Sequence, residues 1–223
     1  MARIPLSPPR TVTLRLAEWY SRRAYGKVMQ PALVLGHHPK ILRAYFAFES
    51  RVARWKALDP ALRHLAELAS AAAIGCSWCV DFGHWQADRL GLPLAKISKV
   101  PDWRAHRESF TEPERLVMEY AEAMTATPPA VTDELAADLR ERLGDRAFVE
   151  LTTMVAVENL RSRLNSAMGL RSQGFSDHCA VPPAWAGAPP PRPGARAAGG
   201  GGPPGGPPPH PPGGPPPPPG GPG

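Results

Sequence analysis

The sequence contains few cysteines and no long apolar run. Its 223 residues include 3 cysteines, an odd and small number that argues against the disulfide framework of a small secreted domain. No apolar run approaches the ~18 residues of a membrane-spanning helix. The first ten residues, MARIPLSPPR, lack the apolar core of a signal peptide. We therefore expect a protein of the reducing cytoplasm without a membrane segment, where a CxxC pair is more often catalytic or metal-binding than structural.

Clustered basic charge and strand-like patterning are also missing. The formal net charge is +6, but most arginines alternate with acidic residues, as they do on solvated helix faces. A nucleic-acid footprint would need the basic residues gathered on one face, so no nucleic-acid partner is expected. No segment shows the polar–apolar alternation of a half-buried strand. The remaining class is an all-α protein.

Apolar residues recur at helical spacing between residues that begin or end helices. The pattern predicts seven or eight helices, at about 11–30, 39–57, 61–74, 78–90, 92–100, 111–125, 133–143 and 147–168. The predicted organisation is an extended arm at 1–10, one helical domain at 11–181 and a tail at 182–223. In the tail, 32 of 42 residues are proline or glycine, so it has too few apolar side chains to form a core and is expected to stay disordered.

Two of the three cysteines, Cys76 and Cys79, form a CxxC motif in the stretch 74–84, and His84 follows closely. Thiols at this spacing can close a disulfide with little backbone movement, and a nearby helix N-terminus or basic group lowers a thiol's pKa. A zinc site would need two more ligands, and the sequence has no second CxxC and no HxxxH. We therefore predict thiol redox chemistry without a metal or cofactor.

The motif and its surroundings resemble a known superfamily. The order Arg63-x-Leu65, then Gly75-Cys76-Ser77-Trp78-Cys79-Val80-Asp81, is similar to carboxymuconolactone decarboxylases and AhpD-like proteins. The later run Glu158-Asn159-Leu160-Arg161-Ser162-Arg163-Leu164-Asn165, continuing to Met168-Gly169-Leu170, resembles their C-terminal helix. The resemblance covers residues 11–181. It implies an AhpD-like all-α fold and assembly into homo-oligomers, trimers or hexamers.

In the peroxidase branch, a Glu precedes the CxxC with eleven residues between them, and a His follows the CxxC after three further residues. The resemblance implies that Cys79 attacks the peroxide, that Cys76 resolves the product as a disulfide, and that an external dithiol donor reduces that disulfide. The Glu and His would take the thiol proton, because the thiolate is the nucleophile.

This sequence departs from the pattern at both proton-relay positions. His64 occupies the position of the Glu, and Gly83 that of the His. Substitutes lie close by: Glu67 is three residues beyond His64 on nearly the same helix face, and His84 is one residue beyond Gly83. One residue rotates a helical side chain by about 100°, so His84 reaches Cys79 only if the helix is irregular there. The candidate relay residues are His64, Glu67 and His84.

The leading hypothesis is a peroxidase-type oxidoreductase that reduces hydroperoxides through Cys76 and Cys79. Two alternatives stay open. The first is a non-catalytic helical oligomer with a redox-sensing CxxC or a small-ligand pocket, suggested by the altered relay. The second is a lactone or small-acid enzyme of the decarboxylase type, working through His64, Glu67 and His84.

Overall fold

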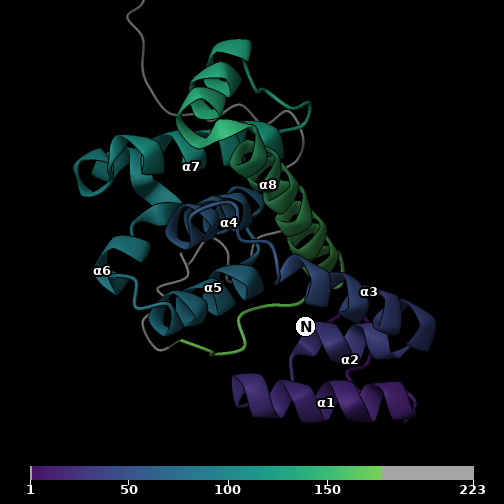
Figure 1. Ribbon diagram of the computed structural model, residues 1–223. Coiled ribbons are helices and arrows are strands. Elements are labelled where there is room, and N and C mark those ends of the chain that lie inside the picture. The colour runs from purple at the N-terminus through teal and green to yellow at the C-terminus, as the bar shows by residue number, and fades with distance from the viewer. Residues whose placement is uncertain (1, 177–223) are drawn as a thin grey trace, which may run out of the picture. The chain divides into compact units, whose positions relative to one another are not determined.

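The computed structural model describes residues 2–176, and this part of the chain is all-helical (Figure 1). The predicted fold class is therefore confirmed. The elements are α1 (Val12–Tyr25), α2 (Gln30–Gly36), α3 (Pro39–Val52), α4 (Pro60–Ile74), α5 (Ser77–Arg89), α6 (Leu94–Ile97), the 3₁₀ helix η1 (Val100–Ser109), α7 (Glu112–Thr125) and α8 (Asp133–Ala167). Residues 177–223 lie outside the described part of the chain. They comprise the end of the predicted domain, which contains the third cysteine, Cys179, and the predicted tail at 182–223.

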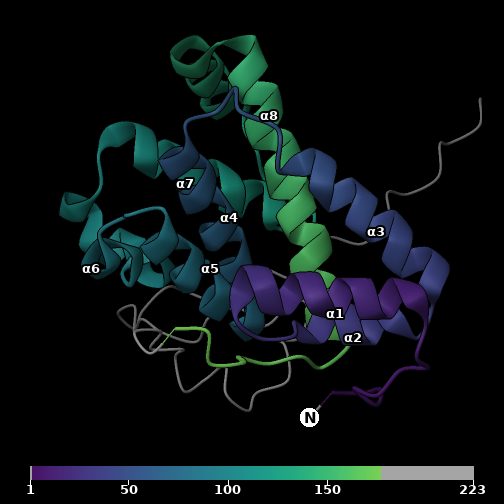
Figure 2. The same ribbon diagram turned by 60° about the horizontal axis from the view of Figure 1, so that its bottom comes forward.

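Helix α4 is the central element, and it leads directly into the CxxC. Asp59 caps its N-terminus, with Oδ1 accepting the backbone N–H groups of Ala61 and Leu62 at 2.9 and 3.0 Å. Gly75 ends it at φ 76°, a left-handed conformation that glycine adopts without a Cβ penalty. Helices α5, α7 and α8 and the 3₁₀ helix η1 pack around α4 (Figures 1 and 2). The small side chains of α4, among them Ala66 and Ala69, are almost fully buried and permit this close packing.

Helices α1, α2 and α3 form a second group beside α8 (Figure 2). Leu14 of α1, Leu35 of α2 and Leu42 of α3 share one buried cluster, and Leu164 of α8 packs against it. A further cluster joins Val52 of α3 to Met154 and Val157 of α8. The space enclosed between this group and helices α4, α5 and α8 is where the site described below lies.

Several predicted boundaries were wrong. The first helix ends at Tyr25 rather than near residue 30, because Gly26 turns the chain at φ 77°. Pro31 does not end a helix but lies in the first turn of α2, where its missing N–H leaves no hydrogen bond unmade. Helix α3 ends at Val52, short of the predicted residue 57. Gly144, at φ 74°, interrupts α8, so the two helices predicted at 133–143 and 147–168 are both present.

The N-terminal residues 2–10 form no helix or strand. Arg3 joins this segment to the C-terminal end of α8: its backbone N–H donates to the Met168 carbonyl at 2.8 Å, and its guanidinium donates to the Ala167 carbonyl. Within the described residues, no helix combines the length and the apolar character needed to cross a membrane.

Candidate active site

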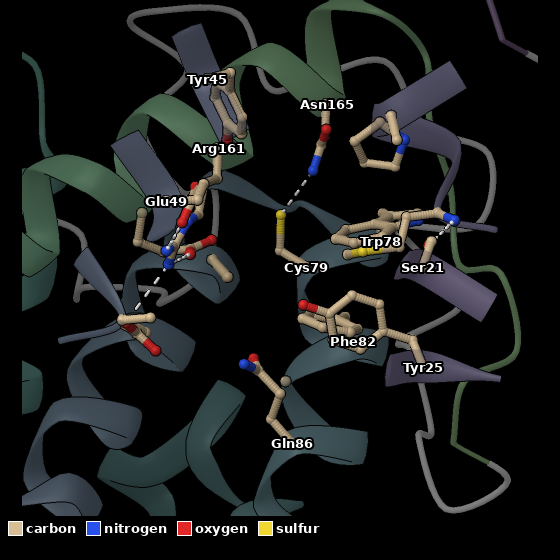
Figure 3. Close-up of a pocket in the computed structure, with 18 of the residues that line it drawn as sticks. Ser21, Tyr25, Tyr45, Glu49, Trp78, Cys79, Phe82, Gln86, Arg161 and Asn165 are labelled. Atoms are coloured by element: carbon tan, nitrogen blue, oxygen red, sulfur yellow. Dashed lines mark hydrogen bonds and ion pairs between the residues drawn. The ribbon is translucent and has the colours of Figure 1, made fainter. Parts of the chain in front are cut away.

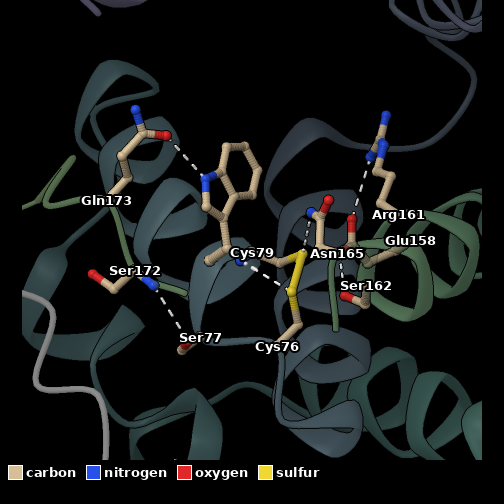
Figure 4. Close-up of a disulfide and its surroundings, with 10 residues drawn as sticks. Cys76, Ser77, Cys79, Glu158, Arg161, Ser162, Asn165, Ser172 and Gln173 are labelled. Carbon is tan, nitrogen blue, oxygen red and sulfur yellow. Dashed lines mark hydrogen bonds and ion pairs between the residues drawn. A yellow bond between two sulfur atoms is a disulfide. The ribbon is translucent and has the colours of Figure 1, made fainter. Parts of the chain in front are cut away.

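The two cysteines of the CxxC occupy the start of helix α5 and form a disulfide (Figure 4). Cys76 is the N-cap residue, and Cys79 lies in the first turn, with 5.3 Å between their Cα atoms. Both are buried, at 1% and 8% exposed. After reduction, a Cys79 thiolate would lie at the positive end of the α5 dipole, which stabilises an anion and lowers a thiol's pKa.

A cavity of about 450 Å³ opens beside Cys79. Its walls come from helices α1 to α5 and α8, and Cys79 is part of the lining whereas Cys76 is not. Figure 3 shows the Cys79 sulfur at the centre, with Phe82 and Tyr25 on one side and Arg161 and Glu49 across from them. The cavity therefore gives a small molecule access to one sulfur of the pair.

Asn165 of α8 contacts the cavity-facing sulfur directly. Its Nδ2 donates a hydrogen bond to Cys79 Sγ at 3.4 Å, and the amide is 2% exposed. A hydrogen bond donated to sulfur favours the thiolate over the thiol once the disulfide is reduced. Asn165 therefore adds to the effect of the α5 N-terminus.

The opposite wall carries an ionic cluster centred on Arg161. Its guanidinium binds Glu49 of α3 through two hydrogen bonds of 2.9 and 2.6 Å, and contacts Glu67 at 3.5 Å and Glu158 at 3.4 Å. Glu67 also pairs with Arg63 at 3.3 Å. Burial disfavours the Arg161 charge, but the hydrogen bonds with Glu49 and the charges of Glu67 and Glu158 outweigh it and hold its pKa well above the usual value.

Glu158 is the most deeply buried carboxyl group of this cluster, at 6% exposed. Burial raises its pKa to about 7, the charge of Arg161 opposes this, and the charge of Glu67 adds to it. Its Oε1 accepts a hydrogen bond from Ser162 Oγ at 2.7 Å. Glu158 also lines the cavity.

Of the three predicted relay residues, His64 and Glu67 line the cavity together with Cys79. Burial lowers the pKa of His64, with the charge of Glu67 opposing, so its imidazole is neutral near pH 7. Its Nε2 has no hydrogen-bond partner within the described residues.

His84 is buried but lies outside the cavity lining. Its Nδ1 is 2.8 Å from the Val80 carbonyl oxygen one turn back in α5, so that nitrogen carries the proton and donates. The helix continues without a break through Gly83. The irregularity that would let His84 turn toward Cys79 is therefore not present.

Comparison with known proteins establishes the family. The chain is 36% identical over 184 residues to the uncharacterized protein YnjA of Escherichia coli (strain K12), which covers 82% of this chain and 95% of YnjA. The model of the carboxymuconolactone decarboxylase family matches residues 39–123. The chain belongs to the carboxymuconolactone decarboxylase family.

Solved structures of similar fold are consistent with this assignment. The debrominase Bmp8 in its apo form superposes with a TM-score of 0.67 at 18% identity, over 76% of this chain and 92% of Bmp8. A peroxidase-related protein with an alkylhydroperoxidase AhpD core from Ralstonia eutropha JMP134 superposes with a TM-score of 0.65 at 21% identity, over 78% of this chain and 94% of that protein. At these identities the likeness concerns the fold.

One departure from the peroxidase branch of the family has a steric explanation. Gly83, which holds the position of the relay His, lines the cavity. A Cβ added there would lie 2.9 Å from Cδ1 of Leu68, which is 2% exposed in the core. A histidine at residue 83 would therefore require Leu68 to move.

Sequence reasoning missed the contribution of α8 to the site. Glu158, Arg161 and Asn165 are spaced at i, i+3 and i+7, which places them on one helix face. The run that resembles the C-terminal helix of family members contains all three, and this spacing within it is the signal that could have identified them. Glu49 of α3 carried no such signal, because its role depends on the position of Arg161.

Proposed function

We propose that the protein is a thiol-dependent hydroperoxide reductase in which Cys79 attacks the peroxide and Cys76 resolves the product. The observation that carries this proposal is the asymmetry of the pair: Cys79 lines the cavity and Cys76 is buried behind it. An incoming peroxide meets only the Cys79 sulfur. The sulfur of Cys76 is already within bonding reach of Cys79.

The reaction balances with one external reductant. The Cys79 thiolate attacks the terminal oxygen of ROOH, so an S–O bond forms, the O–O bond breaks and the electron pair leaves on RO⁻, which takes up a proton to give ROH. The Cys76 thiol then attacks the Cys79 sulfenic acid, which gives the disulfide and water. An external dithiol donor reduces the disulfide and supplies two electrons and two protons.

The cavity favours a small organic hydroperoxide. Aromatic rings line the side near Cys79, with Trp78 and Phe82 stacked at 5.2 Å and Tyr25 edge-on to Phe82 at 5.4 Å. An alkyl or aryl group would lie against the rings while the O–O bond faced the sulfur.

We further propose a cytoplasmic homo-oligomer. A reducing compartment supplies dithiol donors and recycles the disulfide. Helices α1 and α3 present a groove whose lining includes Val12, Leu16, Trp19 and Phe46. Their exposed fractions are 74%, 62%, 66% and 36%. Contiguous exposed apolar surface of this kind is typical of a protein interface, and a second copy of the chain is the proposed occupant.

Peroxide consumption by the purified protein tests the function. With cumene hydroperoxide and excess dithiothreitol, we expect turnover in the wild type and none in Cys79→Ser. After removal of dithiothreitol, reduced Cys76→Ser should consume one equivalent of peroxide and stop at the sulfenic acid, because no resolving thiol is then present. Equal, slow consumption by the wild type and Cys79→Ser would contradict the proposal. Turnover of a lactone by a Cys76→Ala/Cys79→Ala protein would instead support the decarboxylase-type alternative.

A second candidate function is the reductive removal of a halogen from a small aromatic ring. Bmp8 is a debrominase, and a cysteine-to-alanine variant of it has been crystallised with 2,3,4-tribromopyrrole. The aromatic wall beside Cys79 supports the same reaction here, in which two thiols become a disulfide and the ring exchanges halide for hydrogen. Halide release from a brominated pyrrole, lost in Cys79→Ser, would support this function over peroxide reduction.

A further inference from the structure

We propose that Glu158 is the general acid of this reaction and protonates the alkoxide that leaves when Cys79 attacks the hydroperoxide. The inference rests on the proposed function. It assigns the proton transfer to a carboxyl group of α8, rather than to the residues around the CxxC that the sequence pointed to.

The position of Glu158 suits it to this role. Glu158 and Asn165 project from one face of α8 toward the disulfide (Figure 4), and both line the cavity that Cys79 faces. Asn165 contacts the attacking sulfur, so a peroxide bound between them would have its leaving oxygen on the Glu158 side. The hydrogen bond from Ser162 Oγ to Oε1 fixes the orientation of the carboxyl group.

The titratable and charged groups around Glu158 come from four helices. They are Arg161 on α8, Glu67, Arg63 and His64 on α4, Glu49 and Tyr45 on α3, and Cys79 on α5. Two arginines face three carboxylates, so protonation of one carboxyl group balances the cluster. Burial acts in the same direction and raises the pKa of Glu158 to about 7. Near neutral pH, Glu158 is therefore present in both forms, so the carboxylate can accept a proton and the acid can donate one.

The other candidates are less suited to donate this proton. Glu67 contacts two guanidinium groups, those of Arg63 and Arg161, and is placed to hold Arg161. His64 is neutral near pH 7 because burial lowers its pKa, so it lacks the acidic proton of an imidazolium ion. His84 does not reach the cavity.

The proton returns to Glu158 in each cycle. In the reduced enzyme, the Cys79 thiol gives its proton to the Glu158 carboxylate, which produces the thiolate and the neutral acid. Attack on ROOH forms Cys79–SOH and RO⁻, and Glu158 protonates RO⁻ to ROH. The external dithiol then reduces the Cys76–Cys79 disulfide and restores the Cys79 thiol. This thiol again transfers its proton to the Glu158 carboxylate.

Two electrophiles separate this role from a structural one. Alkylation by iodoacetamide expels iodide, which needs no proton, whereas cumene hydroperoxide expels an alkoxide, which does. Both reactions are measured at Cys79 by peptide mass spectrometry, in reduced protein with Cys76→Ser. We expect Glu158→Gln to slow oxidation about 100-fold, the lower end of general-acid effects, and to change alkylation less than about threefold. Glu150→Gln, which replaces another buried carboxyl group of α8 outside the cavity lining, should change neither rate.

The pH profile gives an independent result. The rates of alkylation and of oxidation both depend on the fraction of Cys79 that is present as the thiolate. The ratio of oxidation rate to alkylation rate therefore depends only on the fraction of the general acid that is protonated. In protein that retains Glu158, this ratio should fall about tenfold per pH unit above about pH 7. In Glu158→Gln, the ratio should not depend on pH. If Glu158→Gln does not fold, Glu158→Asp keeps the acid and should keep the pH-dependent ratio at a lower oxidation rate.

Three outcomes contradict one proposal or the other. Equal slowing of oxidation and alkylation in Glu158→Gln, or slowing of neither, would overturn the role of Glu158. A pH-independent ratio in the Glu158 protein or in Glu158→Asp would overturn it as well. A different result would overturn the proposed function instead. In this result, protein that retains Glu158 is alkylated normally at Cys79 but is oxidised no faster than free cysteine.

Discussion

Asn165 of α8 is hydrogen-bonded to the sulfur of Cys79, the cysteine that lines the cavity. It is the side chain whose amide donates to Cys79 Sγ, at 3.4 Å in a buried setting. A hydrogen bond to a charged group contributes about 1.5–3 kcal/mol, and about 1.4 kcal/mol corresponds to one pKa unit. Loss of this donor should therefore raise the thiol pKa measurably.

We predict that Asn165→Ala raises the pKa of Cys79 by about one unit and slows its alkylation at pH 7 about tenfold. The measurement is the rate of iodoacetamide labelling against pH, in reduced Cys76→Ser protein. Asn159→Ala is the matched control, because Asn159 lies on the same helix and bonds Thr125 and the Val155 carbonyl instead. An unchanged labelling profile in Asn165→Ala would show that the hydrogen bond does not act on the thiolate.

At the scale of single residues, the sequence identified the CxxC pair, and two of the residues expected beside it, His64 and Glu67, line the cavity with Cys79. Cys76 and Cys79 are a local motif, and spacing alone brings them together. Asn165 is 86 residues from Cys79 in the sequence, so only the packing of α8 on α4 and α5 makes it a neighbour. The position of His84 follows the helical geometry that the sequence predicted, because a shift of one residue turns a helical side chain by about 100°, here out of the cavity.

At the scale of elements, helix α5 is tied to the chain that follows α8. Asp81 of α5 is fully buried, and its carboxylate accepts the backbone N–H groups of Gln173, Phe175 and Ser176 at 2.8 to 3.1 Å, together with the Ser172 hydroxyl at 3.1 Å. Gln173 then accepts a hydrogen bond from Trp78 Nε1 at 3.1 Å. These contacts hold residues 172–176 against the helix that carries Cys79.

We predict that Asp81→Asn lowers the free energy of unfolding by about 2 kcal/mol, because an amide oxygen is a weaker, uncharged acceptor for these donors. Urea unfolding measures the loss, and hydrogen exchange should accelerate first at the amides of Phe175 and Ser176. Asp88→Asn, at an exposed position on the same helix, should change stability by less than about 0.5 kcal/mol. A stability equal to the wild type in Asp81→Asn would mean that the segment is held by packing alone.

Helix starts and stops were predictable where a local signal fixes them. The cap of Asp59 before Pro60 and the Thr111–Glu114 capping box are sequence patterns with a direct hydrogen-bonding cause. Proline was ambiguous, because it ends one helix and begins another equally well. Here the first helix ends at the left-handed Gly26, and Pro31 lies in the first turn of α2.

At the scale of the whole molecule, the described residues leave one apolar face uncovered. The groove between α1 and α3 includes Leu16, Trp19 and Tyr20, and Tyr20 also lines the cavity beside Cys79. A second copy bound to this groove would therefore adjoin the entrance to the site. Assembly and peroxide access would then share part of one surface.

We predict that Leu16→Glu and Trp19→Glu dissociate the proposed homo-oligomer into smaller species, because a buried, unpaired carboxylate at the interface opposes association. Light scattering coupled to size-exclusion chromatography measures the mass. Val149→Glu is the matched control, since Val149 is as exposed as Leu16, at 63% against 62%, but lies on α8 outside the groove. If Val149→Glu dissociates the oligomer while both groove variants keep it, the copies associate through α8, and the apolar face of α1 and α3 has another partner.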